Sequence, residues 1–150
     1  MPRVRFTIPA PVPPERVMAM LTDFSERRPE IWPTLDRRFY KVHDVDATGA
    51  DIEEGGPPQL GLWEHVIYTW TENTVRWTVL ESNAFASGSY VDVAVLPDGA
   101  GASLLHVEWN RSPTSLKGFL LMLLVVLTKG AILRRNVFAP AFTRSRAPGP

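Results

Sequence analysis

The 150-residue chain contains no cysteine, so it forms neither a disulfide framework nor a thiolate metal site. Its sixteen Lys and Arg residues balance sixteen Asp and Glu residues, which leaves no net positive field to attract nucleic acid. It also lacks the Gly-x-Ser-x-Gly elbow of serine hydrolases and the Gly-x-x-x-x-Gly-Lys loop that binds phosphates. The length suits one domain, and the absence of cysteine fits a cytoplasmic location, which we expect.

No apolar run is long enough to span a membrane. Residues 119–127 are apolar throughout, but Lys129 and Gly130 interrupt the run, and a spanning helix needs roughly 20 such residues. Residues 1–9 contain no long apolar segment of the kind found in a secretion signal, so we expect none. Lys117 precedes the apolar run and Arg134 and Arg135 follow it, which leaves peripheral contact with a lipid surface open.

The last third of the chain predicts a strand over residues 103–111, then one helix from 116 to about 138. Ser115, with Pro113 and Thr114 before it, supplies the chemistry of a helix start. Apolar residues then occur on every side of the predicted helix, whereas a surface helix shows a single apolar stripe. This helix must therefore be covered on more than one side, by the sheet, by an apolar ligand or by a second subunit in a homodimer.

The rest of the chain predicts a short strand over residues 3–8, helices over 14–24 and 25–31, and a run of strands. The candidate strands are 38–45, 50–53, 62–71, 74–82, 88–96 and 103–111. Tight turns at residues 72–73 and 97–102 define two hairpins, in which Tyr68 lies opposite Trp77 and Val93 opposite Val107. Because side chains alternate along a strand, one face of the sheet is aromatic and aliphatic and the other is mostly polar.

Several segments resemble the START-like or Bet v 1-like superfamily (SRPBCC), in particular its bacterial polyketide cyclase/dehydrase and lipid-transport branch. They are residues 4–8, 10–17 and 21–24, the Trp32-Pro33 pair, the Gly-rich turn before the last strand and the long C-terminal helix. The resemblance covers about residues 4–142 of a single domain, followed by a basic, Pro-rich tail over 143–150. It implies an α+β helix-grip fold, a curved antiparallel sheet wrapped around the C-terminal helix, with an apolar cavity between them.

Residues expected to line that cavity share an inward position in this layout, and the aromatic ones add a hydrogen-bonding edge. From the strands they are Tyr40, Tyr68, Trp70, Trp77, Val91, Val93, Val107 and Trp109, and from the helix Phe119, Leu120, Leu123 and Leu127.

Glu64 is the one carboxylate that the predicted register sends toward the apolar face. If it is desolvated there, its pKa rises and it is a candidate acid or base; otherwise it lies in water at the cavity mouth or pairs with an arginine. The acidic run at residues 51–54 is interpreted as a solvated edge. The histidines at 43, 65 and 106 are interpreted as solvated, so we expect no metal site and no cofactor.

These observations leave two classes of function. The first is the binding or carrying of a hydrophobic small molecule, such as a lipid, a polyketide or an aromatic metabolite. The alternative is an enzyme of the polyketide cyclase/aromatase type acting in the same cavity. No residue matches a specific catalytic motif, so the sequence favours a carrier over an enzyme.

Overall fold

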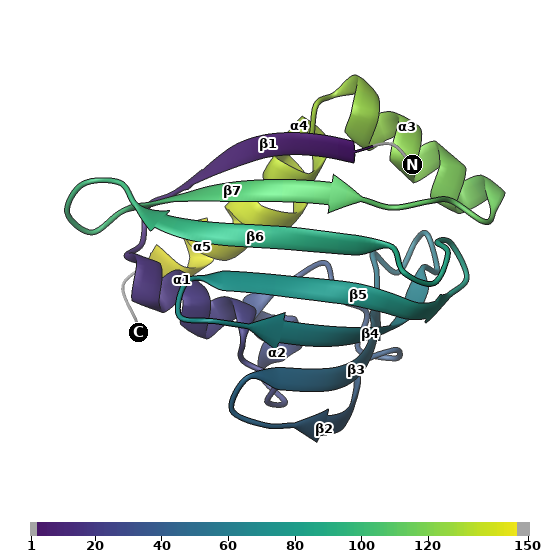
Figure 1. The fold of residues 1–150 in the computed structure, drawn as a ribbon, viewed down its shortest axis with the longest axis horizontal. Coiled ribbons are helices and arrows are strands. Elements are labelled where there is room, and N and C mark those ends of the chain that lie inside the picture. The colour runs from purple at the N-terminus through teal and green to yellow at the C-terminus, as the bar shows by residue number, and fades with distance from the viewer. Residues whose placement is uncertain (1–2, 147–150) are drawn as a thin grey trace.

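One antiparallel sheet of seven strands forms the body of the protein (Figure 1). The computed structural model describes residues 3–146, and side chains as far as residue 144. The spatial order of the strands is β1-β7-β6-β5-β4-β3-β2. Their bounds are β1 Arg3–Ala10, β2 Lys41–Val45, β3 Gly49–Gly55, β4 Trp63–Trp70, β5 Thr74–Ser82, β6 Tyr90–Pro97 and β7 Ser103–Asn110.

Helices cover one face of this sheet, which is the far face in Figure 1. Two short helices connect β1 to β2, and four helical segments follow β7. They are α1 Pro14–Leu21, α2 Arg28–Ile31, α3 Leu116–Leu127, α4 Ala131–Leu133, the π-helical turn η1 Arg134–Phe138 and α5 Ala139–Arg146. This arrangement confirms the α+β helix-grip fold.

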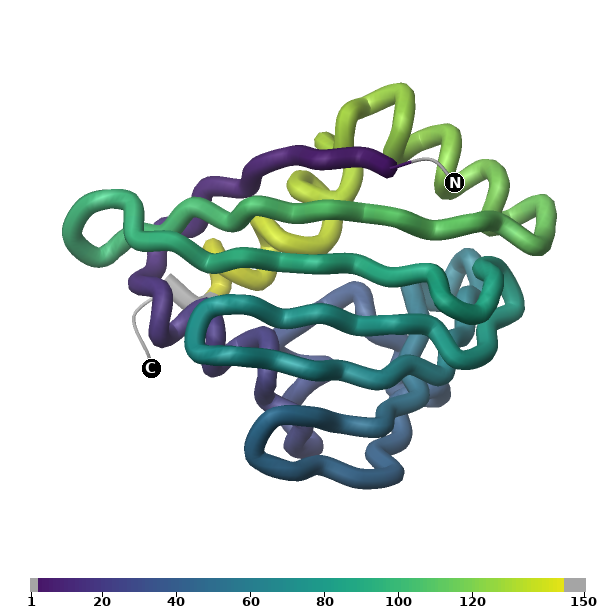
Figure 2. The backbone as a smooth tube through the Cα atoms, in the orientation of Figure 1, coloured from purple at the N-terminus to yellow at the C-terminus, as the bar shows by residue number. Residues whose placement is uncertain are grey.

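The C-terminal helix is not continuous, so the expectation of one helix over residues 116–138 is wrong. The chain bends by 100° between α3 and the segment that begins at Ala131, and Figure 2 shows the sharp turn. Lys129 and Gly130 adopt left-handed backbone angles there, with φ of 51° and 82°. A Cβ atom on Gly130 would lie 2.3 Å from the ring of Phe6, so only glycine fits this elbow.

The predicted strand register is confirmed. Tyr68 pairs with Trp77, and Val93 pairs with Val107. The inner face of the sheet is buried under the helices, with Val66, Val79 and Leu105 fully enclosed. The two turns and the alternation of apolar residues are local features, which is why they could be predicted.

The helix α5 continues through residues 143–146, which the sequence assigned to the tail, while residues 147–150 lie outside the described part of the chain. Across residues 3–146 no single helix has the length and hydropathy of a membrane span. Only α3 taken together with Ala131–Arg144 passes such a test, as a pair bent by 100°.

Candidate functional site

An inner cavity of about 190 Å³ lies between the sheet and the C-terminal helices. A smaller space of about 110 Å³ adjoins it and shares Glu54, Trp77 and Phe138 among its lining residues. The apolar walls come from Trp77, Val91, Val107 and Trp109 of the sheet, Phe85 of a loop, and Leu121, Leu133, Val137 and Phe138 of the helical segments.

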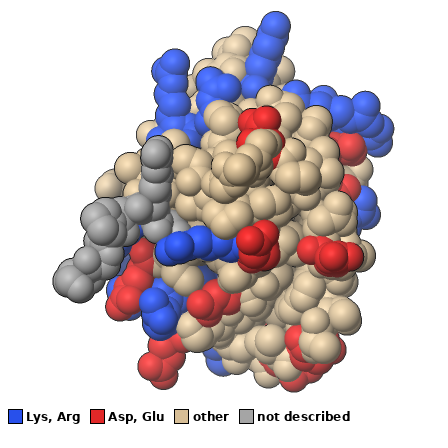
Figure 3. All heavy atoms as spheres, turned by 90° about the vertical axis from the view of Figure 1, so that its left-hand side faces the viewer, with Lys and Arg blue, Asp and Glu red and all other residues tan. Residues whose placement is uncertain are grey.

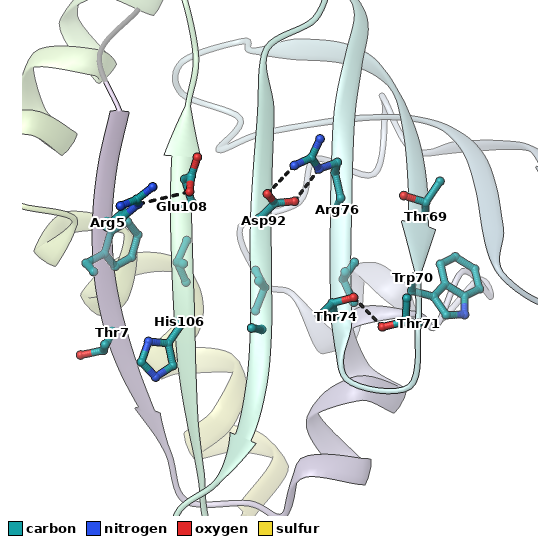
Figure 4. Close-up of a pocket in the computed structure, with 15 residues that line it drawn as sticks. Arg5, Thr7, Thr69, Trp70, Thr71, Thr74, Arg76, Asp92, His106 and Glu108 are labelled. Carbon is teal, nitrogen blue, oxygen red and sulfur yellow. Dashed lines mark hydrogen bonds and ion pairs between the residues drawn. The ribbon is translucent and has the colours of Figure 1, made fainter.

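A larger hollow of about 730 Å³, the outer hollow, lies on the opposite face of the sheet (Figure 4). Its charged side chains are already paired across neighbouring strands, as Arg76 is with Asp92 (2.6 Å) and Arg5 with Glu108 (3.3 Å). Small-molecule sites usually enclose most of the ligand surface. The inner cavity meets that requirement better than the larger but open outer hollow.

Most of the strand residues predicted for the cavity lie at or near it. Trp77, Val91, Val107 and Trp109 line it, and Tyr68 lines the adjoining space. Val93 faces the same side but is enclosed in the core, with 1% of its surface exposed.

Two predicted aromatic residues lie elsewhere. Trp70 stacks on Phe24, with ring centroids 5.7 Å apart, and borders the outer hollow. The hydroxyl of Tyr40 donates to the carbonyl oxygen of Ser25 (2.9 Å), in a separate surface depression. Trp70 keeps the predicted inward orientation, opposite Val75, but does not line the cavity, and the expectation that Tyr40 lines it is wrong.

The four helix residues predicted for the cavity do not line it. Phe119, Leu120 and Leu127 are exposed, and Leu123 is half-buried outside the cavity wall. The buried side of α3 is instead the one that carries Gly118 and Val125. The elbow is the physical cause, because it lets η1 and its flanking turns cover the sheet while α3 turns away.

Glu54 forms the centre of a buried polar network that the sequence analysis missed. It points inward from β3, and Tyr68 donates its hydroxyl hydrogen to Glu54 Oε1. Arg28 of α2 donates from Nε to Glu54 Oε2 (3.4 Å) and from NH2 to the Tyr68 hydroxyl (3.2 Å). The alternation of Ala50, Ile52 and Glu54 was the signal for an inward carboxylate, so interpreting the whole acidic run as solvated was wrong.

The network keeps its tyrosine neutral and its arginine charged. Burial, reinforced by the neighbouring Glu54 carboxylate, raises the pKa of Tyr68 well above its usual value of 10. Burial opposes the charge on Arg28, but Tyr68 and Glu54 outweigh that effect and raise its pKa. Arg28 also donates to the carbonyl oxygens of Leu21 and Asp23, so this buried cation is well satisfied.

Glu64 lies at the cavity as predicted and pairs with an arginine, one of the alternatives left open. Arg111 donates from NH1 to Glu64 Oε2 (2.5 Å) and from NH2 to Glu64 Oε1 (3.1 Å). The Arg111 side chain is 8% exposed and packs over the ring of Phe85. Its Nε atom is buried without a hydrogen-bond partner. Arg111 was missed, although it follows Val107 and Trp109 in the inward alternation of the last predicted strand.

Among residues 3–146, one group of side chains that could hold a metal ion lies on the outer face of the sheet. His43, Asp51 and His65 place their ligand atoms within 4.8 Å of one another. The sequence analysis treated the histidines as separate solvated residues, and it had no signal that brought His43 and His65 together. His106 lies on β7, with β5 and β6 between its strand and that of His65.

No protein-family model matches the sequence, and no curated protein matches it. Solved structures do match the fold. An aromatase/cyclase, Zhui, from Streptomyces sp. R1128 superposes with a TM-score of 0.75 at 13% identity, covering 99% of this chain and 98% of that one. A truncated norcoclaurine synthase from Thalictrum flavum gives 0.69 at 9% identity, covering 99% and 95%. A START superfamily protein from Mycobacterium smegmatis gives 0.64 at 16% identity, covering 90% and 96%.

Identities this low establish the fold alone. The chain has the helix-grip fold shared by START and Bet v 1-like proteins.

Proposed function

We propose that the protein binds a hydrophobic small molecule in the inner cavity. The observation that carries this proposal is a partly enclosed space with aromatic and aliphatic walls and a buried polar side. Such a combination takes up an apolar molecule and orients it through a few polar contacts. The unpartnered Nε atom of Arg111 supplies one such contact, for an oxygen acceptor on the ligand.

The size of the cavity narrows the ligand class. Its volume of about 190 Å³ is below the range of roughly 300–1,000 Å³ typical of ligand pockets. A compact aromatic or polyketide-like molecule with a carbonyl or phenolic oxygen fits better than a long-chain lipid. Trp77, Trp109 and Phe85 would surround its ring system.

The direct test is native mass spectrometry of the purified protein, followed by extraction and identification of any retained molecule. Val91→Phe fills the cavity, and Ala94→Phe adds the same ring to the same strand at the outer hollow. We expect Val91→Phe to abolish retention and Ala94→Phe to preserve it. Equal retention by both folded variants would rule out the inner cavity as the binding site.

A second candidate function, a cyclase/aromatase-type enzyme, is favoured by the two carboxylates at the cavity. Glu54 and Glu64 both line it, and Tyr68 supplies a hydroxyl beside Glu54. General acid–base catalysis needs a group that exchanges a proton with the substrate. Both carboxylates are engaged by arginines, so binding remains the first proposal.

We propose that the exposed apolar face of α3 contacts a membrane, and that the ligand passes between the membrane and the inner cavity. Leu116 and Leu127 are 74% and 76% exposed, and Phe119, Leu120 and Leu124 extend this apolar face between them. Exposed apolar surface of this kind usually marks a contact site.

Charge favours an anionic lipid surface as the occupant of this face. Lys117 and Lys129 are exposed near the two ends of α3, and no Asp or Glu occurs in the sequence after Glu108. Figure 3, which views the molecule from the left-hand side of Figure 1, shows Lys and Arg side chains along its upper edge, and α3 lies toward the far side of that view. Leu121 and Leu133, on either side of the elbow, line the cavity, so the contact lies next to the ligand site.

Vesicle co-sedimentation tests this contact. We expect binding to vesicles that contain phosphatidylglycerol, weaker binding to pure phosphatidylcholine, and loss of binding in the double variant Leu120→Ser, Leu127→Ser. The matched control is Leu80→Ser with Leu96→Ser, two exposed leucines of the sheet. A stable homodimer that α3 variants dissociate, without vesicle binding, would contradict the membrane proposal.

A further inference from the structure

Four side chains from the three strands β2, β3 and β4 meet on the outer face of the sheet. This edge cluster consists of His43, Asp51, Glu53 and His65. His43 Nε2 lies 2.6 Å from Glu53 Oε2, and His65 Nε2 is hydrogen-bonded to Asp51 Oδ1. The two imidazole rings are 5.2 Å apart, measured between centroids.

Strand geometry explains why these residues converge. Asp51 and Glu53 alternate with the inward residues of β3, and Glu53 lies directly across from His65 of β4. In β2 the register shifts, because Val42 pairs with Ile52 and Asp44 pairs with Asp51. His43 follows Val42, which lies opposite the buried Ile52, so alternation turns His43 to the outer face, and the bulge then places both His43 and Asp44 beside Asp51.

The donor set selects a class of metal ion. Imidazole nitrogen together with carboxylate oxygen suits Zn²⁺ and its transition-metal neighbours, whereas Ca²⁺ and Mg²⁺ prefer oxygen alone. Zinc binds such atoms at about 2.0–2.2 Å, which places neighbouring ligands of a tetrahedral ion about 3.3 Å apart.

The ligand atoms of His43, Asp51 and His65 already lie within 4.8 Å of one another. Their side chains are 27–35% exposed, which leaves them room to rotate inward by the remaining distance.

Glu53 is held beside the cluster by a separate contact. Trp63 donates from Nε1 to Glu53 Oε1 (3.2 Å), which leaves Glu53 Oε2 directed at His43. A carboxylate held in this way orients neighbouring imidazoles or completes the coordination shell.

From this geometry we propose that the edge cluster binds one divalent ion of the zinc class, with His43, Asp51 and His65 as ligands and Glu53 as the fourth or orienting group. The ion would join three strands at the edge of the sheet. The edge strand β2 has all five residues exposed, and its ladder partner is β3. A ligand that binds only the folded state stabilises it, so occupancy should protect β2 from local opening.

Zinc titration of tag-free, chelator-treated protein by calorimetry tests the proposal. We expect one Zn²⁺ per chain with a micromolar dissociation constant. His43→Ala and His65→Ala should each weaken binding at least tenfold, and His106→Ala, on the same face of the sheet at β7, should leave it unchanged. Zinc should also slow amide hydrogen exchange in residues 41–45 of the unmodified protein but not of His43→Ala.

Circular dichroism of each variant establishes that it is folded, and His43→Asn provides a second variant of similar size. Absence of saturable binding would overturn the proposal. Zinc binding by His43→Ala and His65→Ala as tight as that of the unmodified protein would also overturn it. So would a loss of affinity in His106→Ala as large as the loss in these two variants. The cluster lies on the face opposite the inner cavity, so ligand retention in the cavity is tested independently of this result.

Discussion

Tyr68 donates its hydroxyl hydrogen to Glu54, and both side chains are buried beside the inner cavity. The tyrosine comes from β4 and the glutamate from β3, and Arg28 of α2 contacts both. One hydrogen-bonded network therefore connects the sheet to the α1–α2 connection. Buried groups of this kind stabilise a fold only while every member has its partner.

Tyr68→Phe should lower the free energy of unfolding by about 1–3 kcal/mol, because it leaves a buried carboxylate and a buried guanidinium each short of a partner. Urea denaturation measures this loss. Tyr90→Phe is the matched control, since its hydroxyl donates to Glu108 on the outer face (2.8 Å). We expect a smaller loss of stability in Tyr90→Phe. Equal losses in the two variants would mean that the buried network stabilises the fold no more than a single hydrogen bond at the surface.

Alkaline pH should destabilise the protein through two tyrosines whose pKa values are raised in the folded state, Tyr40 and Tyr68. Burial raises the pKa of Tyr40 to about 12, and that of Tyr68 is also raised. In the unfolded chain both phenols ionise near pH 10. The folded state then holds more protons than the unfolded state, so this contribution is complete below pH 10 and is lost as pH rises toward 12.

Urea denaturation between pH 8 and pH 11.5 checks this prediction. Lysines also titrate in this range, so the informative quantity is the difference between the unmodified protein and Tyr40→Phe. We expect the variant to lose less stability above pH 10. Parallel pH profiles for the two proteins would contradict the prediction.

Trp77→Ala should weaken the binding of an apolar fluorescent dye by about 1–3 kcal/mol, because the indole forms part of the cavity wall. Trp77 also stacks on Tyr68, with ring centroids 5.5 Å apart, so the variant enlarges the site as well as removing a contact. Trp70→Ala removes the same side chain from the neighbouring strand, at a position outside the cavity wall, where it stacks on Phe24. A loss of dye affinity in Trp70→Ala and not in Trp77→Ala would place the dye outside the inner cavity.

Glu64→Gln tests whether Glu64 acts as a catalytic acid or base. The amide keeps the size and one acceptor for Arg111 but cannot exchange a proton. For a carrier we expect ligand affinity to change less than about threefold, while stability falls by about 1–3 kcal/mol as the ion pair is lost. Glu81→Gln, at an exposed position on β5, is the control. Turnover of a polyketide-like substrate that Glu64→Gln abolishes would establish the enzyme instead.

The sequence predicted the sheet because its signals are local. The turn between Trp70 and Val75 and the alternation of apolar residues were enough to place Tyr68 against Trp77. The missed features depend on distant partners. Glu54 is satisfied by Arg28, 26 residues away, and nothing in the acidic run signals that partner.

The same reasoning applies to the edge cluster and to α3. The edge cluster requires the pairing of β2 with β3, and the sequence analysis predicted no turn between residues 45 and 49 that would bring those strands together. A helix that is apolar on all sides must pack against other parts of the protein or a partner on several sides. Which parts pack against it depends on where the chain bends. The bend places Gly130 against the ring of Phe6, which is far away in the sequence.

Gly130→Ala tests that elbow directly. The left-handed backbone and the ring of Phe6 both oppose a Cβ atom, so we expect the free energy of unfolding to fall by about 2–4 kcal/mol. Gly99→Ala is the matched control, with φ of 73° and nothing within 4 Å of the added atom. Backbone strain alone should reduce its stability by about 1 kcal/mol.

A double-mutant cycle with Phe6→Leu then isolates the steric contribution. The leucine removes the ring that the new Cβ would meet, so Gly130→Ala should be less damaging in that background than in the unmodified protein. Equal losses for Gly130→Ala and Gly99→Ala, or no coupling to Phe6, would mean that the contact with β1 does not determine the bend. If the two substitutions are coupled, the position of α3 depends on the close approach of Phe6 in β1 to Gly130.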